Sequence, residues 1–192
     1  SQRELRAGLY ESIKTGLIRN AGLFRFIEAN QRLIDRQDPK TLEKIVAASV
    51  RMKAEVVGLD EREARPRMTL NFGHTLGHAI EAVTGYRALL HGEAIAWGMI
   101  AALHISRRRN LVAAGARDRI EALIRYFQPP PLPPVSPRRL LQTASGDKKN
   151  RGGVRRFVLL QGIGNAVVAE DVTDAEVLSA IESIRQAPES SQ

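Results

Sequence analysis

The stretch from Asn71 to Glu81 reads NFGHTLGHAIE, and ten residues later the chain continues with HGE at 91–93. These two segments hold three of the four histidines of the chain, His74, His78 and His91. Positions i and i+4 share one face of a helix, so a helix over 73–84 would present His74 and His78 together. Neutral imidazoles with a carboxylate are a ligand set of catalytic zinc, which keeps one coordination position open. The stretch therefore predicts a helical domain with a metal site.

Two glycines lie beside these histidines on the expected helix. Gly73 and Gly77 have the same spacing of four residues, and each helical glycine costs about 1 kcal/mol relative to alanine. The pair therefore indicates that a backbone or a ligand comes close to the helix. The alternative is a tightly packed helix with ordinary histidines, but three histidines within eighteen residues favour a site.

The first helix offers a carboxylate for such a site. Apolar residues recur every four positions from Leu5 to Leu17, while Glu11 and Lys14 stand among small and apolar residues on another side of the same turns. A helix of this kind is expected to be buried on both sides. The alternative for Glu11 and Lys14 is an i,i+3 ion pair on a wet face, for which this helix has little polar surface.

Composition restricts the class of protein and the kind of metal site. The 192 residues are 43% hydrophobic and 26% charged, which is typical of one globular domain. No apolar run approaches the ~18 residues of a membrane span and the first residues are polar, so we expect a cytoplasmic protein that does not bind a membrane. The chain has no cysteine, so a metal must be held by histidine and carboxylate.

The net charge of +8 predicts an anionic partner. Lys and Arg are scattered along the chain and aromatic residues make up only 5%, which disfavours nucleic acid and favours a small anionic substrate. The chain contains neither a G-x-G-x-x-G fingerprint after a strand nor a P-loop, so nothing in it is expected to bind a nucleotide by itself.

The predicted fold class is mainly α, with one small β-hairpin. Beyond the first helix, periodicity and capping signals predict helices over 22–30, 38–57, 73–84, 91–109, 113–127 and 173–186. Short β-branched runs around the glycines of RFVLLQGIGNAVVAEDV predict a hairpin near 155–171. The run PPPLPP at 129–134 is expected to join two helical parts.

Five segments resemble, in order and spacing, the C-terminal half of the 3-dehydroquinate synthase family. They are ESIKTGLI from Glu11, KAEVVGLDERE from Lys53, RMTLNFGHTLGHAIEAVTGY from Arg67, LLHGEAIAWGM from Leu89, and GDKKN followed by RFVLLQGIG. The resemblance implies that residues 1–192 form the single helical metal- and substrate-binding domain of the dehydroquinate synthase-like fold. It also implies that the N-terminal α/β domain, which binds NAD in the family, is absent from this chain.

The resemblance implies a reaction as well. The family converts 3-deoxy-D-arabino-heptulosonate 7-phosphate into 3-dehydroquinate and phosphate in the shikimate pathway, with transient oxidation by NAD and a zinc or cobalt ion as Lewis acid. The expected partner is thus a small sugar-phosphate acid, without nucleic acid or membrane, and the full-length enzyme is expected to be a homodimer. The isolated domain is expected to be inactive.

The site residues implied by the resemblance fall into three groups. The expected metal ligands are Glu11, His74 and His91. The expected catalytic residues are Lys14, Lys53, Asn71 and His78. The expected substrate-binding residues are Glu63, Arg67, Lys148 and Lys149, with one lysine of the last pair on the phosphate side. Helical spacing alone would instead pair His74 with His78 as metal ligands, whereas the family pattern leaves His78 for the substrate.

Three alternatives stay open from the sequence. Other sugar-phosphate cyclases and metal-dependent alcohol dehydrogenases share this kind of helical metal domain, although Lys53, Arg67, Asn71 and His78 together favour a substrate with both carboxylate and phosphate. A zinc hydrolase would use Glu11 or Glu81 as general base, but H-E-x-x-H is absent. A noncatalytic basic scaffold for nucleic acid is the alternative of another class.

Overall fold

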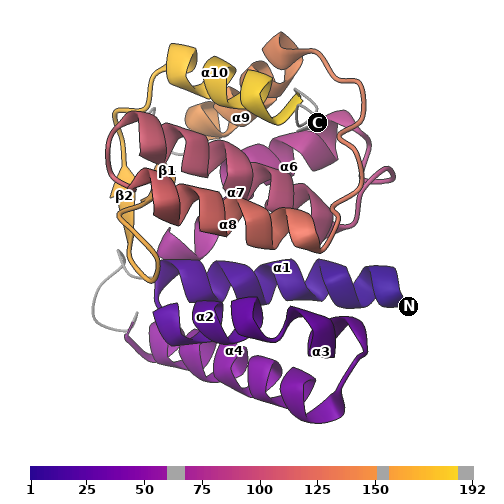
Figure 1. Ribbon diagram of the computed structural model, residues 1–192. Helices are drawn as coiled ribbons and strands as arrows, with labels where there is room; N and C mark the ends of the chain where they lie inside the picture. The colour runs from indigo at the N-terminus through magenta and orange to yellow at the C-terminus, as the bar shows by residue number, and fades with distance from the viewer. Residues whose placement is uncertain (60–67, 151–155, 186–192) are drawn as a thin grey trace.

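The described residues form a mainly helical fold with one antiparallel hairpin, as the sequence predicts (Figure 1). The computed structural model describes residues 1–59, 68–150 and 156–185, without the side chains of 57, 59 and 147–150. Its helices are α1 (Gln2–Ile18), α2 (Ala21–Ala29), α3 (Gln31–Asp35), α4 (Pro39–Leu59), the 3-10 helix η1 (Thr69–Asn71), α6 (His74–Val83), α7 (His91–Arg108), α8 (Ala114–Tyr126), α9 (Pro137–Asn150) and α10 (Asp174–Arg185). The strands are β1 (Phe157–Leu160) and β2 (Ala166–Ala169).

Helix α7 forms the centre of the upper part of the molecule in Figure 1, where α1, α6, α8, α10 and β1 pack around it. Every residue from Gly92 to Leu103 is buried, and most of these residues are small or aliphatic. A helix that is apolar on all sides is stable only when other elements cover it all round. Because His91 is the first residue of α7, this packing fixes the position of the His91 backbone.

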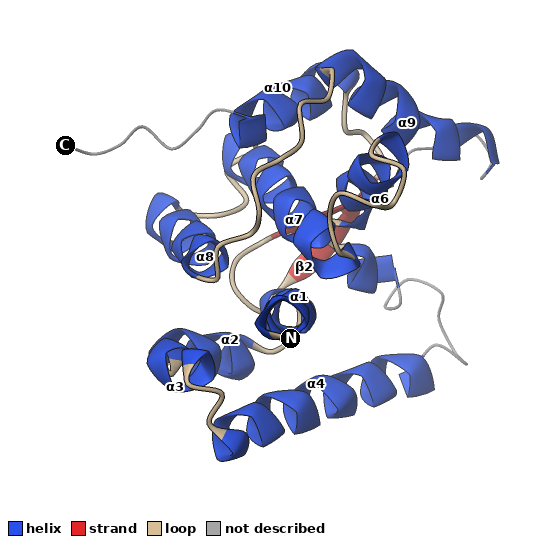
Figure 2. Ribbon diagram, turned by 90° about the vertical axis from the view of Figure 1, so that its right-hand side faces the viewer, coloured by secondary structure: helices blue, strands red, loops and turns tan. Residues whose placement is uncertain are grey.

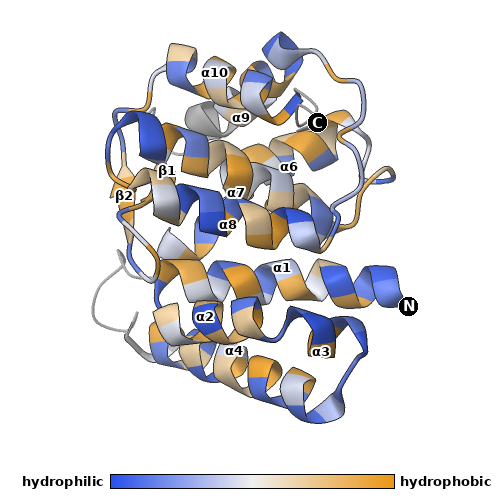
Figure 3. Ribbon diagram, viewed as in Figure 1, coloured by the Kyte–Doolittle hydropathy of each residue, from blue (hydrophilic) through white to orange (hydrophobic). Residues whose placement is uncertain are grey.

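Helix α1 lies between this upper part and the group formed by α2, α3 and α4 (Figure 2). All residues from Ser12 to Ile18 are buried, which confirms that the helix is covered on both sides. Its first turn is hydrophilic (Figure 3) and is closed by a capping box, in which the Ser1 side chain accepts from the Glu4 backbone N–H. The buried part of α1 includes Lys14, beside Glu11.

Glycines bring α6 and α7 unusually close together. A Cβ atom at Gly98 would overlap the carbonyl oxygen of Gly73, and one at Gly77 would lie 2.6 Å from Ile95 Cδ1. The close approach expected at Gly73 and Gly77 is thus made by a neighbouring helix. Gly73 has a φ of 79°, which favours glycine, and serves as the N-cap, so the helix begins at His74 and not at 73.

The hairpin pairs Phe157 with Ala169 and Leu160 with Ala166, which confirms the prediction for 155–171. The proline run at 129–134 lies between α8 and α9 without helix or strand, as expected. Helices α3 and α9 were not predicted. The signal for α9 is Pro137 in the first helical position, where the missing N–H costs nothing. None of the helices among the described residues is long and apolar enough to cross a membrane.

Candidate metal centre

The centre lies where α1 meets the first turns of α6 and α7. His74 is the first residue of α6 and His91 the first residue of α7, while Glu11 lies in the middle of α1. A Cβ atom at Gly92 would overlap the backbone of Ala7, so the start of α7 rests directly on α1. Glu11, one turn after Ala7, therefore faces the imidazoles.

One oxygen of Glu11 points at two imidazole nitrogens. Glu11 Oε1 lies 3.9 Å from His91 Nε2 and 4.0 Å from His74 Nε2. Oε1 is buried, and among the described residues it has no hydrogen-bond partner. Zinc binds such atoms at about 2.0–2.2 Å, which places neighbouring ligand atoms about 3.3–3.6 Å apart. The two distances from Glu11 Oε1 thus exceed that spacing by only a few tenths of an ångström.

The second nitrogen of each imidazole also has a partner. His74 Nδ1 lies 3.2 Å from the carbonyl oxygen of Phe72, and His91 Nδ1 lies 3.2 Å from both carboxylate oxygens of Glu81. A carbonyl oxygen can only accept, so His74 Nδ1 donates and its Nε2 keeps a free lone pair. Burial, helped by the charge of Lys14, lowers the pKa of His74 to about 4, so this imidazole is neutral at pH 7.

The other oxygen of Glu11 is bound by Lys14. Lys14 Nζ donates to Glu11 Oε2 at 2.8 Å, and the Lys14 side chain is 6% exposed. Burial would raise the pKa of Glu11, but the charge and hydrogen bond of Lys14, together with His74 and His91, outweigh burial, and the pKa is lowered. Burial in turn lowers the pKa of Lys14 despite its partner. The carboxylate is therefore ionised and held in place, with one oxygen left for the imidazoles.

His78 also belongs to the cluster. Ring nitrogens of His74, His78 and His91 all lie within 4.8 Å of one another, and His78 is exposed. Its ring centroid lies 5.1 Å from that of His74 and 5.8 Å from that of His91. The geometry thus brings together both candidate ligand sets, the one with Glu11 and the one with His78.

The other predicted residues are described only in part. Lys53 on α4 is exposed, yet near enough that its charge lowers the pKa of Lys14. Asn71, at the end of η1, is exposed. Glu63 and Arg67 lie outside the described residues, and Lys148 and Lys149 belong to the last turn of α9, where side chains are not described.

Sequence reasoning missed the contact of Glu81 with His91, because it considered Glu81 only as the base of a hydrolase. Glu81 faces the Nδ1 side of His91, whereas Glu11 faces the Nε2 side, so Glu81 is not placed to act on a water bound to the metal. The spacing puts residues 74, 78 and 81 on one face of α6, but the contact with His91 also depends on how α6 packs on α7.

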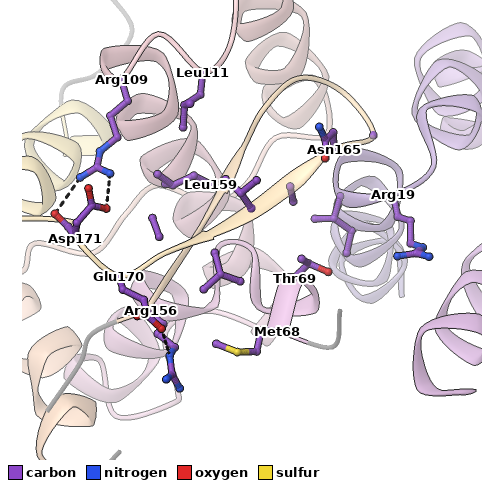
Figure 4. A pocket seen from close by; sticks show the side chains of 16 residues that line it. Arg19, Met68, Thr69, Arg109, Leu111, Arg156, Leu159, Asn165, Glu170 and Asp171 are labelled. Atoms are coloured by element: carbon purple, nitrogen blue, oxygen red, sulfur yellow. Dashed lines mark hydrogen bonds and ion pairs between the residues drawn. The ribbon is translucent and has the colours of Figure 1, made fainter. Parts of the chain in front are cut away.

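A large hollow among the described residues lies outside this centre (Figure 4). It measures about 1220 Å³ and is lined mainly by β2 and its flanking turns, and also by Arg19 and Met68. Neither Glu11 nor any of the three histidines is among its described lining residues. Arg109, at its rim, is paired with Asp171 at 2.7 Å, so this cation is already neutralised.

Comparisons with known proteins agree on a family. The model of the family "3-dehydroquinate synthase C-terminal" matches residues 8–150. The chain is 45% identical over 184 residues to the 3-dehydroquinate synthase of Koribacter versatilis, with 96% of this chain and 50% of that protein covered. It is 48% identical over 168 residues to the enzyme of that name from Halorhodospira halophila, with 87% and 48% covered. The chain thus spans about half the length of these relatives.

Solved structures with the same fold are sugar cyclases. The 2-epi-5-epi-valiolone synthase ValA of Streptomyces hygroscopicus, solved with NAD⁺ and Zn²⁺, superimposes with a TM-score of 0.85 at 28% identity over 96% of this chain and 52% of that one. A 2-deoxy-scyllo-inosose synthase, solved with carbaglucose-6-phosphate, NAD⁺ and Co²⁺, superimposes with a TM-score of 0.77 at 28% identity over 95% and 51%.

Proposed function

The chain belongs to the 3-dehydroquinate synthase family, and from this premise we propose that it is the metal- and substrate-binding half of an enzyme that converts 3-deoxy-D-arabino-heptulosonate 7-phosphate into 3-dehydroquinate and phosphate. The activity is a carbon–oxygen lyase reaction of the shikimate pathway. In this proposal residues 1–192 are one helical domain, an N-terminal α/β domain outside the chain binds NAD, and the complete enzyme is a cytoplasmic homodimer. Identities of 45% and 48% with enzymes of this name, against 28% with the other cyclases, favour this substrate.

The observation that carries the proposal is the buried Oε1 of Glu11, which faces two imidazole nitrogens and has no partner among the described residues. A buried anionic oxygen without a partner is costly, so the arrangement fits a cation between these three groups. A carboxylate with two imidazoles suits zinc, and cobalt takes the same donors. When bound, the ion supplies a Lewis acid for substrate oxygens, while NAD supplies the transient hydride acceptor.

We assign Glu11, His74 and His91 to the metal. The distances from Glu11 Oε1 to the two Nε2 atoms support this set, because the same carboxylate oxygen faces both nitrogens. A metal with three protein ligands keeps a position open for substrate, whereas His78 as a fourth ligand would close it. The exposed His78 is then free to donate to the phosphate.

Other residues of this chain are proposed to bind the substrate or to exchange protons. Lys14 holds Glu11 by its hydrogen bond, and burial brings the pKa of Lys14 closer to the range of a general acid. The exposed Lys53 and Asn71 are proposed to contact the substrate carboxylate and hydroxyls. Arg67 would bind the carboxylate with two parallel hydrogen bonds, which a lysine cannot form.

Two more contacts are carried over from the family pattern. One lysine of the pair Lys148 and Lys149 is proposed to bind the substrate phosphate, for which a cation is required. Glu63 is proposed to lie near the substrate as a further acidic group.

The test joins this chain to the NAD-binding half of the Koribacter versatilis 3-dehydroquinate synthase and measures phosphate release and 3-dehydroquinate formation. With zinc and NAD, the fusion is expected to turn over the heptulosonate phosphate, whereas the chain alone is expected neither to bind NAD nor to turn over. A fusion that binds both cofactors but cyclises only another sugar phosphate would contradict the assigned substrate.

A further inference from the structure

Two buried carboxylates flank the start of α7, and they differ in their partners. Glu93 is bound by Arg3 at 2.6 and 2.7 Å and accepts from the Leu90 backbone N–H at 2.7 Å, so its charge is neutralised. Glu81 is also buried, but the partner that its carboxylate has among the described residues is Nδ1 of His91, 3.2 Å from each oxygen. A buried carboxylate held only by an imidazole has no evident value for folding, because its desolvation is not offset by a permanent cation.

The place of Glu81 is set by rigid packing. Glu81 is on α6, two turns after His74, and α6 is fixed against α7 by the glycine contacts at Gly77 and Gly98. His91 opens α7, so the Glu81–His91 contact joins the two helices at the metal centre. Because both oxygens of Glu81 are equally far from Nδ1, the carboxylate faces that nitrogen squarely.

We propose that Glu81 is a positioning residue, which keeps the proton of His91 on Nδ1 and thereby directs the free lone pair of Nε2 at the metal. The inference rests on the proposed function, since it concerns the same metal centre. An ionised carboxylate accepts hydrogen bonds and cannot donate, so Nδ1 must be the donor. The nitrogen that remains for the metal is Nε2, which faces Glu11 at 3.9 Å.

Glu81 does for His91 what a backbone carbonyl does for His74. The carbonyl oxygen of Phe72 fixes the tautomer of His74 but carries no net charge. The carboxylate of Glu81 fixes the tautomer and adds a negative charge, which raises the basicity of Nε2. Glu81→Gln can keep the first effect and loses the second, whereas Glu81→Ala loses both.

The experiment uses the 192-residue chain, with zinc affinity measured by competition with a chelator and the tautomer of each histidine read by ¹⁵N NMR in the zinc-free protein. Glu81→Ala is expected to weaken zinc binding about 10- to 100-fold and to mix the tautomers of His91 while His74 stays unchanged. Glu81→Gln is expected to keep the His91 tautomer and to weaken binding by less than Glu81→Ala. Glu93→Gln, the matched control, removes a buried carboxylate that has other partners and is expected to leave zinc affinity unchanged.

The inference is overturned if Glu81→Ala binds zinc as the parent chain does, or if its His91 keeps a single Nδ1–H tautomer. Should Glu81→Ala not fold, Glu81→Gln with unchanged zinc affinity overturns the proposed effect of the charge by itself. The proposed ligand set fails in a different way, namely if His91→Ala binds zinc normally. The tautomer of His91 in the zinc-free chain reports on Glu81 in either case.

Discussion

The two sides of α1 differ in how tightly the neighbouring helices are packed. Towards α6 and α7, glycines bring the helix backbones into contact, and the side chains of Glu11 and His74 are held between buried elements. Towards α4, only one face of the neighbouring helix is buried, and Val50 on its outer face is 62% exposed. The proposed metal side is therefore fixed by contacts within this chain, whereas the proposed substrate side, with the exposed Lys53, is open.

The largest expected effect comes from separating α6 and α7, which their glycines bring into close contact. In Gly98→Ala the new Cβ would overlap the Gly73 carbonyl oxygen, so α6 and α7 must separate. We expect a loss of about 3 kcal/mol in the free energy of unfolding, and weaker zinc binding, because His74 and His91 sit on those two helices. Denaturant unfolding and zinc titration measure both effects.

A helical glycine with free space is the matched control. Nothing lies within 4 Å of a Cβ at Gly8, in α1, so Gly8→Ala is expected to raise stability by about 0.5–1 kcal/mol. Equal stability of the two variants would show that the α6–α7 contact is not as tight as described.

The pH dependence of the zinc-free chain probes the same side. The pKa of His74 is lowered to about 4 in the folded state from 6.5, so between these values the unfolded chain binds the extra proton. The free energy of unfolding should therefore rise with pH through this window, by up to about 3 kcal/mol from this group. His74→Gln should remove that part of the slope, and an identical slope in both proteins would contradict the burial of a neutral imidazole.

The smallest effect on stability is expected for a substitution on α4. Lys53→Ala removes an exposed side chain and should change the free energy of unfolding by less than about 0.5 kcal/mol, with zinc affinity unchanged. In the fusion with the NAD-binding half it should nevertheless impair turnover, because Lys53 is assigned to the substrate. Full turnover of this variant would show that Lys53 does not belong to the substrate site.

Local pattern predicted the helices with long amphipathic periods and the hairpin, because side-chain spacing alone determines which face is apolar. It did not predict α3, which is five residues long, or α9, whose apolar positions are few. The pattern also placed Gly73 inside the helix, since spacing does not report a positive φ. The contact of Glu81 with His91 depends on how α6 packs on α7, which no local period contains.

We assign His91 to the metal and His78 to the substrate. This assignment is tested most directly by the zinc content of two variants, His91→Ala and His78→Ala, after dialysis against a weak chelator. We predict that His91→Ala loses tight zinc binding, because one of the two imidazoles that face Glu11 is gone, while His78→Ala keeps one zinc per chain. An equal loss of zinc in both variants would contradict the assignment and favour the pair His74 and His78 at helical spacing.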